Sequence, residues 1–348
     1  MTLTKTQIKE IREHLSNAQN PLFLFDNDQD GLCSFLILQR FIGRGKGFPV
    51  KQTPMSEDYF RRVNELNPDY VFILDVPEVK QSFWEKINQI NLPVVWIDHH
   101  EKNLNDIPKF VKHYNPLFNK KKINLPTTFL CYQVSGKKED LWVSIVGNVS
   151  DKNVPKYWEE FKKDFPELAI ESDDAQEIFY NSEIGKVAQM LGYGLKDKTT
   201  NVISMLKFLM KVKSPHDVLE ESKDNQQIHK RFNEIKKKYL KLIEKAREEY
   251  NGSDVVFFKY GGDTSMSAEI SNGLKFVFPE RYILVAYVKE GRVNLSARGK
   301  NVKKFFVKCL EDFENARGGG HNDAVGGQIL SEDLEKFREK FKGFIENS

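Results

Sequence analysis

Several classes of protein are excluded by what this 348-residue sequence lacks. Its three cysteines, Cys33, Cys131 and Cys309, lie far apart and form no C-x-x-C pair, which argues against disulfides and a thiolate zinc site. No apolar run approaches the roughly 18 residues that a membrane span needs. The N-terminal residues lack the apolar core of a signal peptide, so we expect a cytoplasmic protein that contacts no membrane. The net charge of +3 is too small for a general nucleic-acid coat.

The most informative motif is the run Asp26-Asn27-Asp28-Gln29-Asp30-Gly31, which follows the apolar, strand-like stretch 22–25. The pattern D-x-D-x-D-G also opens an EF-hand calcium loop, but such a loop needs a preceding helix and a Glu at its twelfth position. Here the twelfth position is Ile37, and the preceding stretch is β-like. What remains is an acidic cluster at the carboxyl end of a strand, where open α/β sheets place their active sites.

The first half of the sequence alternates strand-like and helix-like stretches, which predicts an α/β fold with a parallel sheet. Three apolar stretches, 22–25, 70–74 and 94–97, are followed directly by Asp or by Asp and His, and a fourth, 141–146, continues through Gly147-Asn148-Val149-Ser150 to Asp151. We interpret all four as strands. Because parallel strands end at one edge of the sheet, Asp75, Asp98-His99-His100 and Asp151 are predicted to converge on the first acidic run. If the acidic run stays extended, Asp28 and Asp30 project to the same side.

The second half divides into a helical stretch and a smaller α/β unit. Apolar residues at three- and four-residue spacing between about 195 and 250 predict a solvated linker helix rather than a binding helix. Beyond it, strands are predicted over 255–259, 282–288 and 292–297, with helices over 267–274, 302–309 and from Glu332. The predicted domains are therefore residues 1–194, the linker 195–250, and residues 251–348.

The acidic residues and His99 form a ligand set that suits Mn²⁺, with Mg²⁺ or Co²⁺ as substitutes. Five to seven such ligands are enough for two ions that share a carboxylate, the usual arrangement for phosphoryl chemistry. Each residue alone has a plainer interpretation: Asp75 as a helix N-cap, Asp151 as a turn residue, and His99 or His100 as a surface imidazole. Their recurrence at successive strand ends favours the metal site.

These motifs, in this order and spacing, resemble those of the DHH phosphoesterase superfamily, and Gly318-Gly319-Gly320-His321 resembles the DHHA1 domain that commonly follows it. The resemblance implies that Asp28 binds the first metal, Asp30, His99 and Asp151 the second, and Asp75 both. Asp98 would orient a neighbouring histidine, and His100 would face the scissile phosphate. Asp26 matches an acid of RecJ-like members, as a ligand of the first metal or as support for a ligand.

In the second unit, the resemblance implies that Arg298, His321 and the glycines Gly318, Gly319 and Gly320 hold the substrate. A glycine run lets backbone N–H groups approach an anion. The plainer alternative is a flexible turn at the glycines and a solvated Arg298. Among the lysine runs, only Lys303-Lys304 is a candidate for lining a substrate cleft.

The predicted reaction is Mn²⁺-dependent hydrolysis of a terminal phosphodiester bond in a short single-stranded oligonucleotide, of RNA or DNA. Cyclic dinucleotides and inorganic polyphosphate remain alternative substrates, with pyrophosphate the weakest. An alternative of another class is a non-catalytic scaffold of replication complexes. The oligomeric state is left open.

Overall fold

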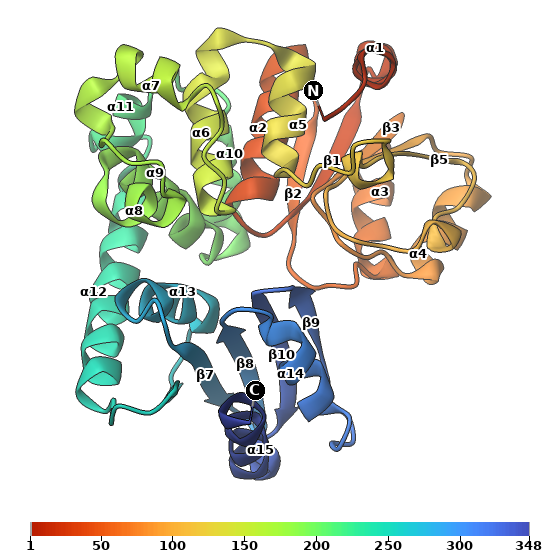
Figure 1. The fold of residues 1–348 in the computed structure, drawn as a ribbon. Helices are drawn as coiled ribbons and strands as arrows, with labels where there is room; N and C mark the ends of the chain where they lie inside the picture. Colours follow the sequence, from red (N-terminus) through yellow and green to blue (C-terminus); the bar gives the residue numbers. More distant parts are fainter. Residues whose placement is uncertain (1, 348) are drawn as a thin grey trace. The chain divides into compact units, whose positions relative to one another are not determined.

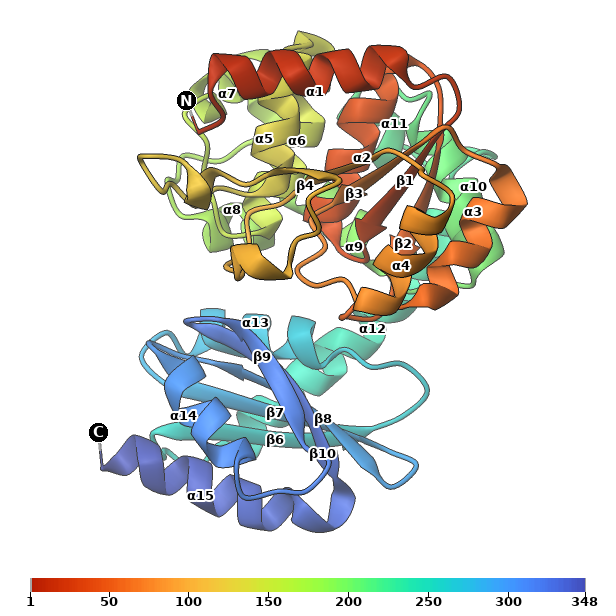
Figure 2. The same ribbon diagram turned by 90° about the vertical axis from the view of Figure 1, so that its right-hand side faces the viewer.

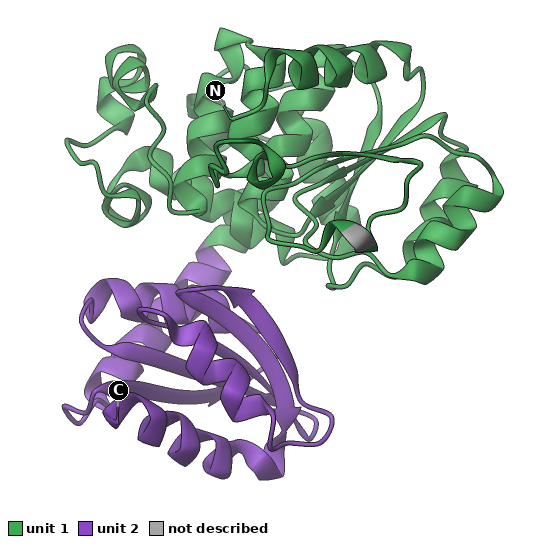
Figure 3. Cartoon of the chain, turned by 45° about the vertical axis from the view of Figure 1, so that its right-hand side comes forward, with its two compact units in different colours: residues 1–232 green, residues 233–348 purple. Residues whose placement is uncertain are grey.

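The computed structural model describes residues 2–347, apart from the side chain of Asn105, and the chain divides into two compact units, residues 1–232 and 233–348 (Figures 1 and 3). Helix α12 (Gln226–Glu248) crosses the boundary between them. Within the described residues, no helix is long and apolar enough to span a membrane. The predicted division at residues 194 and 250 stays a prediction.

The first unit is built on a five-stranded parallel sheet in the order β2-β1-β3-β4-β5. Its strands are β1 (Pro21–Asp26), β2 (Lys46–Val50), β3 (Tyr70–Leu74), β4 (Val94–Ile97) and β5 (Val111–Tyr114). Its helices are α1 (Lys5–Asn17), α2 (Gln29–Ile42), α3 (Phe60–Leu66), α4 (Gln81–Gln89), α5 (Thr127–Ser135), α6 (Leu141–Ser150), α7 (Trp158–Asp164), α8 (Ala175–Asn181), α9 (Glu183–Leu195), α10 (Thr199–Leu209), α11 (Pro215–Leu219) and the start of α12. The predicted parallel α/β sheet is confirmed.

Both faces of this sheet are covered, which explains why its central strands are apolar at almost every position. On one face, Leu24 and Ile73 pack in a core with Trp84 of α4. On the other face, the Phe23 and Phe25 rings lie 5.5 and 5.1 Å from the ring of Phe35 in α2. Helices on both faces leave the carboxyl ends of the strands as the open edge, where residues after each strand can form a site.

One prediction near this edge is wrong, and the condition of another is not met. Residues 141–146 are not a strand but belong to α6, a helix buried on nearly all sides. An apolar run without alternation fits a buried strand or a buried helix equally, and here the helix packs against α2, α5 and α9. The acidic run is not extended either: Asp28 is the N-cap of α2, and Asp30 lies in its first helical turn.

The second unit is a five-stranded mixed sheet in the order β6-β7-β8-β10-β9, with helices on both faces (Figure 2). Its elements are β6 (Val255–Gly261), α13 (Ser267–Val277), β7 (Tyr282–Lys289), β8 (Arg292–Arg298), α14 (Val302–Leu310), β9 (Arg317–His321), β10 (Ala324–Leu330) and α15 (Leu334–Glu346). Phe306 of α14 and Phe337 of α15 fill the core on one face, and α13 covers β7 and β8 on the other. The predicted second α/β unit is confirmed, with a strand, β9, where the glycine run had suggested a turn.

Candidate metal centre

Three neighbouring strands of the first unit end in carboxylates. Asp26 is the last residue of β1, Asp75 follows β3, and Asp98 follows β4. Because β1, β3 and β4 are adjacent and parallel, these side chains meet at the same edge of the sheet. Carboxylate oxygens of Asp26, Asp28 and Asp75 lie within 4.8 Å of one another. The convergence expected from the sequence is present.

A second group forms around His99. Its Nε2 atom lies 3.4 Å from Asp75 Oδ1, 3.8 Å from Asp151 Oδ2 and 3.9 Å from Asp30 Oδ2. These gaps exceed the length of a hydrogen bond. They approach the separation of about 3 Å between neighbouring ligands of an octahedral ion bound at about 2.1 Å. Asp75 belongs to both groups, since its carboxylate lies near Asp26 and Asp28 as well as near His99.

The N-terminus of α5 holds Asp30 in place. Backbone N–H groups of Thr127 and Thr128 donate to its two carboxylate oxygens at 2.8 and 2.7 Å. The Thr128 hydroxyl donates to the Asp30 carbonyl, and the Thr127 hydroxyl donates to Asp75 Oδ1 at 2.9 Å. A helix N-terminus favours an anion through its exposed N–H groups and dipole. The sequence analysis missed both threonines; their one signal was a helix start, Pro126-Thr127-Thr128, before an apolar run.

Two backbone features bring α2 and Asp75 into place. A Cβ atom added to Gly31 would lie 2.4 Å from the Asp26 carbonyl oxygen, so only glycine allows α2 to begin this close to β1. Asp75 has φ +63°, a left-handed conformation that costs a non-glycine residue roughly 1–3 kcal/mol. Its N–H donates to the carbonyl of Ile97, which holds this turn against β4. Backbone strain of this kind is typical of functional sites.

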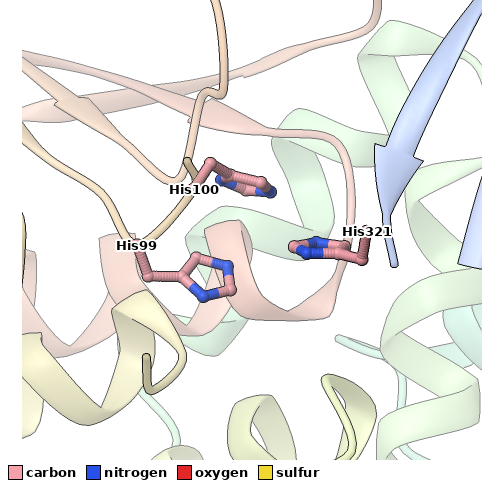
Figure 4. A group of neighbouring side chains, drawn as sticks. All are labelled: His99, His100 and His321. Carbon is pink, nitrogen blue, oxygen red and sulfur yellow. The ribbon is translucent and has the colours of Figure 1, made fainter. Parts of the chain in front are cut away.

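Each of the two histidines has a hydrogen-bond partner at its Nδ1 atom. Figure 4 shows the side chains of His99 and His100 near each other. His99 Nδ1 lies 2.8 Å from Asn124 Oδ1, and His100 Nδ1 lies 2.7 Å from Asp98 Oδ1. An amide oxygen only accepts, so Asn124 places the His99 proton on Nδ1 and turns Nε2 towards the carboxylates. Asp98 contacts His100, one of the two histidines that it was predicted to orient, and its role stays a prediction. Asn124 was not predicted from the sequence. His321, also drawn, belongs to β9 of the second unit.

Lys102 forms an ion pair with Asp98. Its ammonium group lies 2.5 Å from Asp98 Oδ2 and 3.7 Å from the centre of the Trp96 ring. Burial alone would raise the pKa of Asp98, but the hydrogen bond with His100 and the charge of Lys102 outweigh it and hold the pKa below its usual value. Asp98 is therefore an ionised, buried partner for His100.

Asp26, Asp75 and Asp151 behave in the opposite way. Burial, followed by the charge of Asp28, raises the pKa of Asp26 to about 8. Burial, followed by the charge of Asp30, raises the pKa values of Asp75 and Asp151 well above their usual range. Like charges gathered in a recess are costly unless a cation neutralises them. The donor set of carboxylates and one imidazole therefore fits a divalent metal such as Mn²⁺.

The residues predicted to hold substrate lie together in the second unit. Ala324 of β10 pairs with Arg298 on one side and with His321 on the other, and residues opposite each other in antiparallel strands point to the same face. Arg298 is only 8% exposed, and its Nε donates to Asn272 Oδ1 of α13. The alternative of a solvated Arg298 is therefore wrong.

The glycines of β9 have different surroundings. A Cβ atom on Gly318 would meet Phe306 and Leu310 at 2.7–3.0 Å, so this glycine lets α14 pack on the sheet. Gly320 has φ +138°, and a side chain there would clash with Ala324. Gly319 has nothing within 4 Å of a Cβ position and leaves the surface open. The structure thus requires glycine at positions 318 and 320. Among the described residues, nothing requires a glycine at position 319.

Comparisons with known proteins agree with this architecture. Residues 251–347 match the family model of the DHHA1 domain. The Thermus thermophilus RecJ structure with Mn²⁺ is similar over 98% of this chain at 14% identity and a TM-score of 0.72, but the chain spans only 54% of that protein. A manganese-bound exonuclease RecJ is similar over 99% of this chain and 95% of that one, at 14% identity and a TM-score of 0.67.

A shorter enzyme is similar as well. The pGpG-specific phosphodiesterase PggH from Vibrio is 12% identical, with 94% of this chain and 99% of that chain covered and a TM-score of 0.50. A search of curated proteins found no match.

Fold and site together define a two-unit α/β protein with a carboxylate–histidine centre at the carboxyl edge of a parallel sheet. Residues 251–347 of the second unit match the DHHA1 domain, and the fold of the whole chain is similar to that of RecJ. The resemblance is confirmed for the DHHA1 domain and for the overall fold.

Proposed function

We propose that this protein is a Mn²⁺-dependent phosphodiesterase that removes terminal nucleotides from short single-stranded oligonucleotides. The observation that carries the proposal is the position of Asp75. It shares one carboxylate between the group of Asp26 and Asp28 and the group around His99. A shared carboxylate between two ligand groups is what a two-metal site for phosphoryl chemistry requires.

The first metal would be held by Asp28 and Asp75, with Asp26 as a further ligand or as support for one. The second would be held by Asp30, Asp75, His99 and Asp151. When bound, such a pair of ions activates water and neutralises charge that develops on phosphate oxygens. The chain's own part is to keep the ligands in position, through the N–H groups of α5 for Asp30 and through Asn124 for His99.

His100 is suited to proton transfer. Its Nδ1 is bound to ionised Asp98, which stabilises a positive charge on the ring and turns Nε2 away from that carboxylate. We assign to the Nε2 proton of His100 the protonation of the leaving oxygen, or the stabilisation of its charge. Lys102 and Trp96 keep Asp98 ionised and dry, so His100 does not lose its partner during the reaction.

The DHHA1 unit would bind the substrate through Arg298 and His321. The Arg298 guanidinium is held by Asn272 and by the carbonyls of Ala297 and Val325, which fixes its orientation before a phosphate binds. Two similar folds belong to proteins described as an exonuclease and as a pGpG-specific phosphodiesterase. The second spans the same length as this chain and supports a short linear substrate.

A substrate panel tests the proposal. End-labelled RNA and DNA oligomers of several lengths, cyclic dinucleotides and polyphosphate are incubated with Mn²⁺ and the chain or its Asp75→Ala variant. We expect release of mononucleotides from short linear oligomers and loss of this activity in Asp75→Ala. The control Asp173→Ala, at an exposed site in the loop before α8, should retain it. Turnover by Asp75→Ala would contradict the two-metal assignment, and consumption of polyphosphate alone would contradict the nuclease assignment.

A further inference from the structure

Helix α14 of the second unit has two different faces. Val302, Phe306 and Cys309 are buried against the sheet and α15. The opposite face carries three lysines and borders a concave surface that encloses a volume of about 550 Å³. This surface is lined by Lys303, Lys304, Val307, Lys308, Glu311 and Asn322.

Three lysines and one glutamate, Glu311, line this surface, which gives it a net positive charge. Within residues 2–347, none of the three ammonium groups lies within 4.0 Å of a carboxylate. Two of them lie over aromatic rings instead: Lys304 Nζ is 4.4 Å from the centre of the Phe305 ring, and Lys308 Nζ is 4.9 Å from that of Phe344. Ammonium groups beside aromatic rings are a common arrangement at surfaces that bind single-stranded nucleic acid.

This surface adjoins the turn that carries His321. Asn322 follows His321 directly, and its carbonyl accepts the N–H of Lys303 at 3.0 Å. The Asn322 side chain also donates to Asn301, the N-cap of α14. The turn between β9 and β10 is therefore fastened to the start of α14. Arg298 and His321 lie on the face of the sheet that α13 covers, whereas α14 covers the other face. An oligonucleotide held at one end by Arg298 and His321 would therefore reach the lysines by bending around this turn.

We propose that Lys303, Lys304 and Lys308, the lysine face of α14, bind backbone phosphates of a single-stranded oligonucleotide beyond its terminal nucleotide. This inference rests on the proposed function, since it extends the same substrate site. It accounts for three lysines that neither the metal centre nor the fold requires. Its consequence is a preference for oligomers over dinucleotides that weakens as salt rises.

The test measures binding of a labelled dT octamer and a dT dinucleotide by fluorescence anisotropy, from low to moderate salt. Excess chelator prevents hydrolysis. For single strands, each neutralised phosphate contributes about 0.7 to the slope of log affinity against log salt. The variant Lys303→Gln/Lys304→Gln/Lys308→Gln should therefore lose about 2 from the slope for the octamer, at roughly 0.7 per lysine. Its affinity for the octamer should fall towards that for the dinucleotide.

The matched control is Lys237→Gln/Lys238→Gln/Lys241→Gln, which removes the same charge from exposed positions of α12. We expect it to keep the wild-type slope. An unchanged slope in the α14 variant, or an equal loss in both, would overturn the inference. Should the α14 variant fail to fold, Lys304→Gln and Lys308→Gln alone should each lower the slope by about 0.7.

The outcomes also separate this inference from the function on which it rests. If the octamer binds through the lysine face but Mn²⁺ produces no hydrolysis of any linear oligomer, the proposed function is wrong and the binding surface stands. If short oligomers are hydrolysed but the octamer binds no better than the dinucleotide, the function stands and the lysine face is wrong. Lysine-dependent binding to anionic lipid vesicles without binding to the octamer would also overturn the inference.

Discussion

His99 Nε2 lies 3.4 Å from Asp75 Oδ1, although the two residues follow different strands of the sheet. The distance is too long for a hydrogen bond, and each partner is held by a separate neighbour. Asn124 fixes the His99 ring, and the Thr127 hydroxyl donates to Asp75. The two side chains are thus held by neighbours other than each other, as the ligands of metal sites typically are.

Removal of divalent metal should lower the thermal stability of the first unit. The carboxylates of Asp26, Asp28 and Asp75 lie within 4.8 Å of one another and repel without a cation. A metal present at a hundredfold excess over its Kd stabilises by about 2.7 kcal/mol. We expect the melting temperature to fall with chelator and recover with Mn²⁺, measured by circular dichroism. Asp75→Ala should show little of this response, and a full response in that variant would contradict the assigned site.

Loss of the Asn124 side chain should weaken metal binding without unfolding the protein. Groups that orient a metal-binding histidine typically contribute 10–100-fold to metal affinity. We expect Asn124→Ala to raise the Kd for Mn²⁺ by roughly tenfold or more in isothermal titration calorimetry. Asn124→Asp keeps an acceptor for His99 Nδ1 and should restore most of the affinity. Equal losses in both variants would show that the amide acts in some other way.

Gly147 of α6 should be essential for the position of Asp30. A Cβ atom there would lie 2.3 Å from the Thr128 hydroxyl oxygen, so Thr128 and its bonds to Asp30 would have to shift. Overpacking of this kind costs typically 1–3 kcal/mol. We expect Gly147→Ala to lower both Mn²⁺ affinity and stability.

The same substitution at Gly343 of α15 serves as the control, because nothing lies within 4 Å of its Cβ position. Gly343→Ala should leave Mn²⁺ affinity unchanged and should not destabilise the protein, since alanine is the better helix former. Wild-type affinity in Gly147→Ala would refute the link between α6 and Asp30.

Arg298 should contribute to substrate binding more than to the chemical step. Lysine lacks the planar guanidinium that donates to Asn272 and to a phosphate together. We expect Arg298→Lys to raise KM for a short oligomer roughly tenfold, about 1.4 kcal/mol, with little change in kcat. Arg292→Lys, at the other end of β8, is the matched control and should behave as wild type. A fall in kcat alone would argue against a binding role.

His113 should make the first unit less stable in mild acid. Burial, followed by the charge of Lys102, lowers the pKa of His113 to about 4, although Asp98 opposes this shift. The pKa of His113 is lower in the folded protein than in the unfolded chain. The contribution of neutral His113 to stability is therefore fully present above about pH 6.5 and is lost as the pH falls towards 4. Between pH 7 and pH 5 this amounts to about 2 kcal/mol.

Urea unfolding measures this effect through tryptophan fluorescence, since Trp84, Trp96, Trp142 and Trp158 all lie in the first unit. The loss of stability from pH 7 to pH 5 should be smaller by about 2 kcal/mol in His113→Phe than in the wild type. An identical pH dependence in the two proteins would rule out His113 as the source.

Much of the fold was predictable because its signals are local. The strands at 70–74 and 94–97 have the bounds expected from the sequence. Residues 141–146 could not be assigned correctly, because an apolar run carries no period that separates a buried helix from a buried strand. The glycine run could not be assigned to a strand from the sequence either, because its strand β9 depends on pairing with β10.

The sequence by itself determined which acids and histidines stand at the ends of apolar stretches, and hence that a carboxylate-rich centre was to be expected. Only the tertiary structure decided how they are held. Strand order places Asp26, Asp75 and Asp98 side by side, and the packing of α5 brings Thr127 and Thr128 to Asp30. The N–H groups that bind Asp30 belong to the backbone, which every residue shares. No residue type in the sequence indicates these N–H groups, so they can be identified only once the position of helix α5 is known.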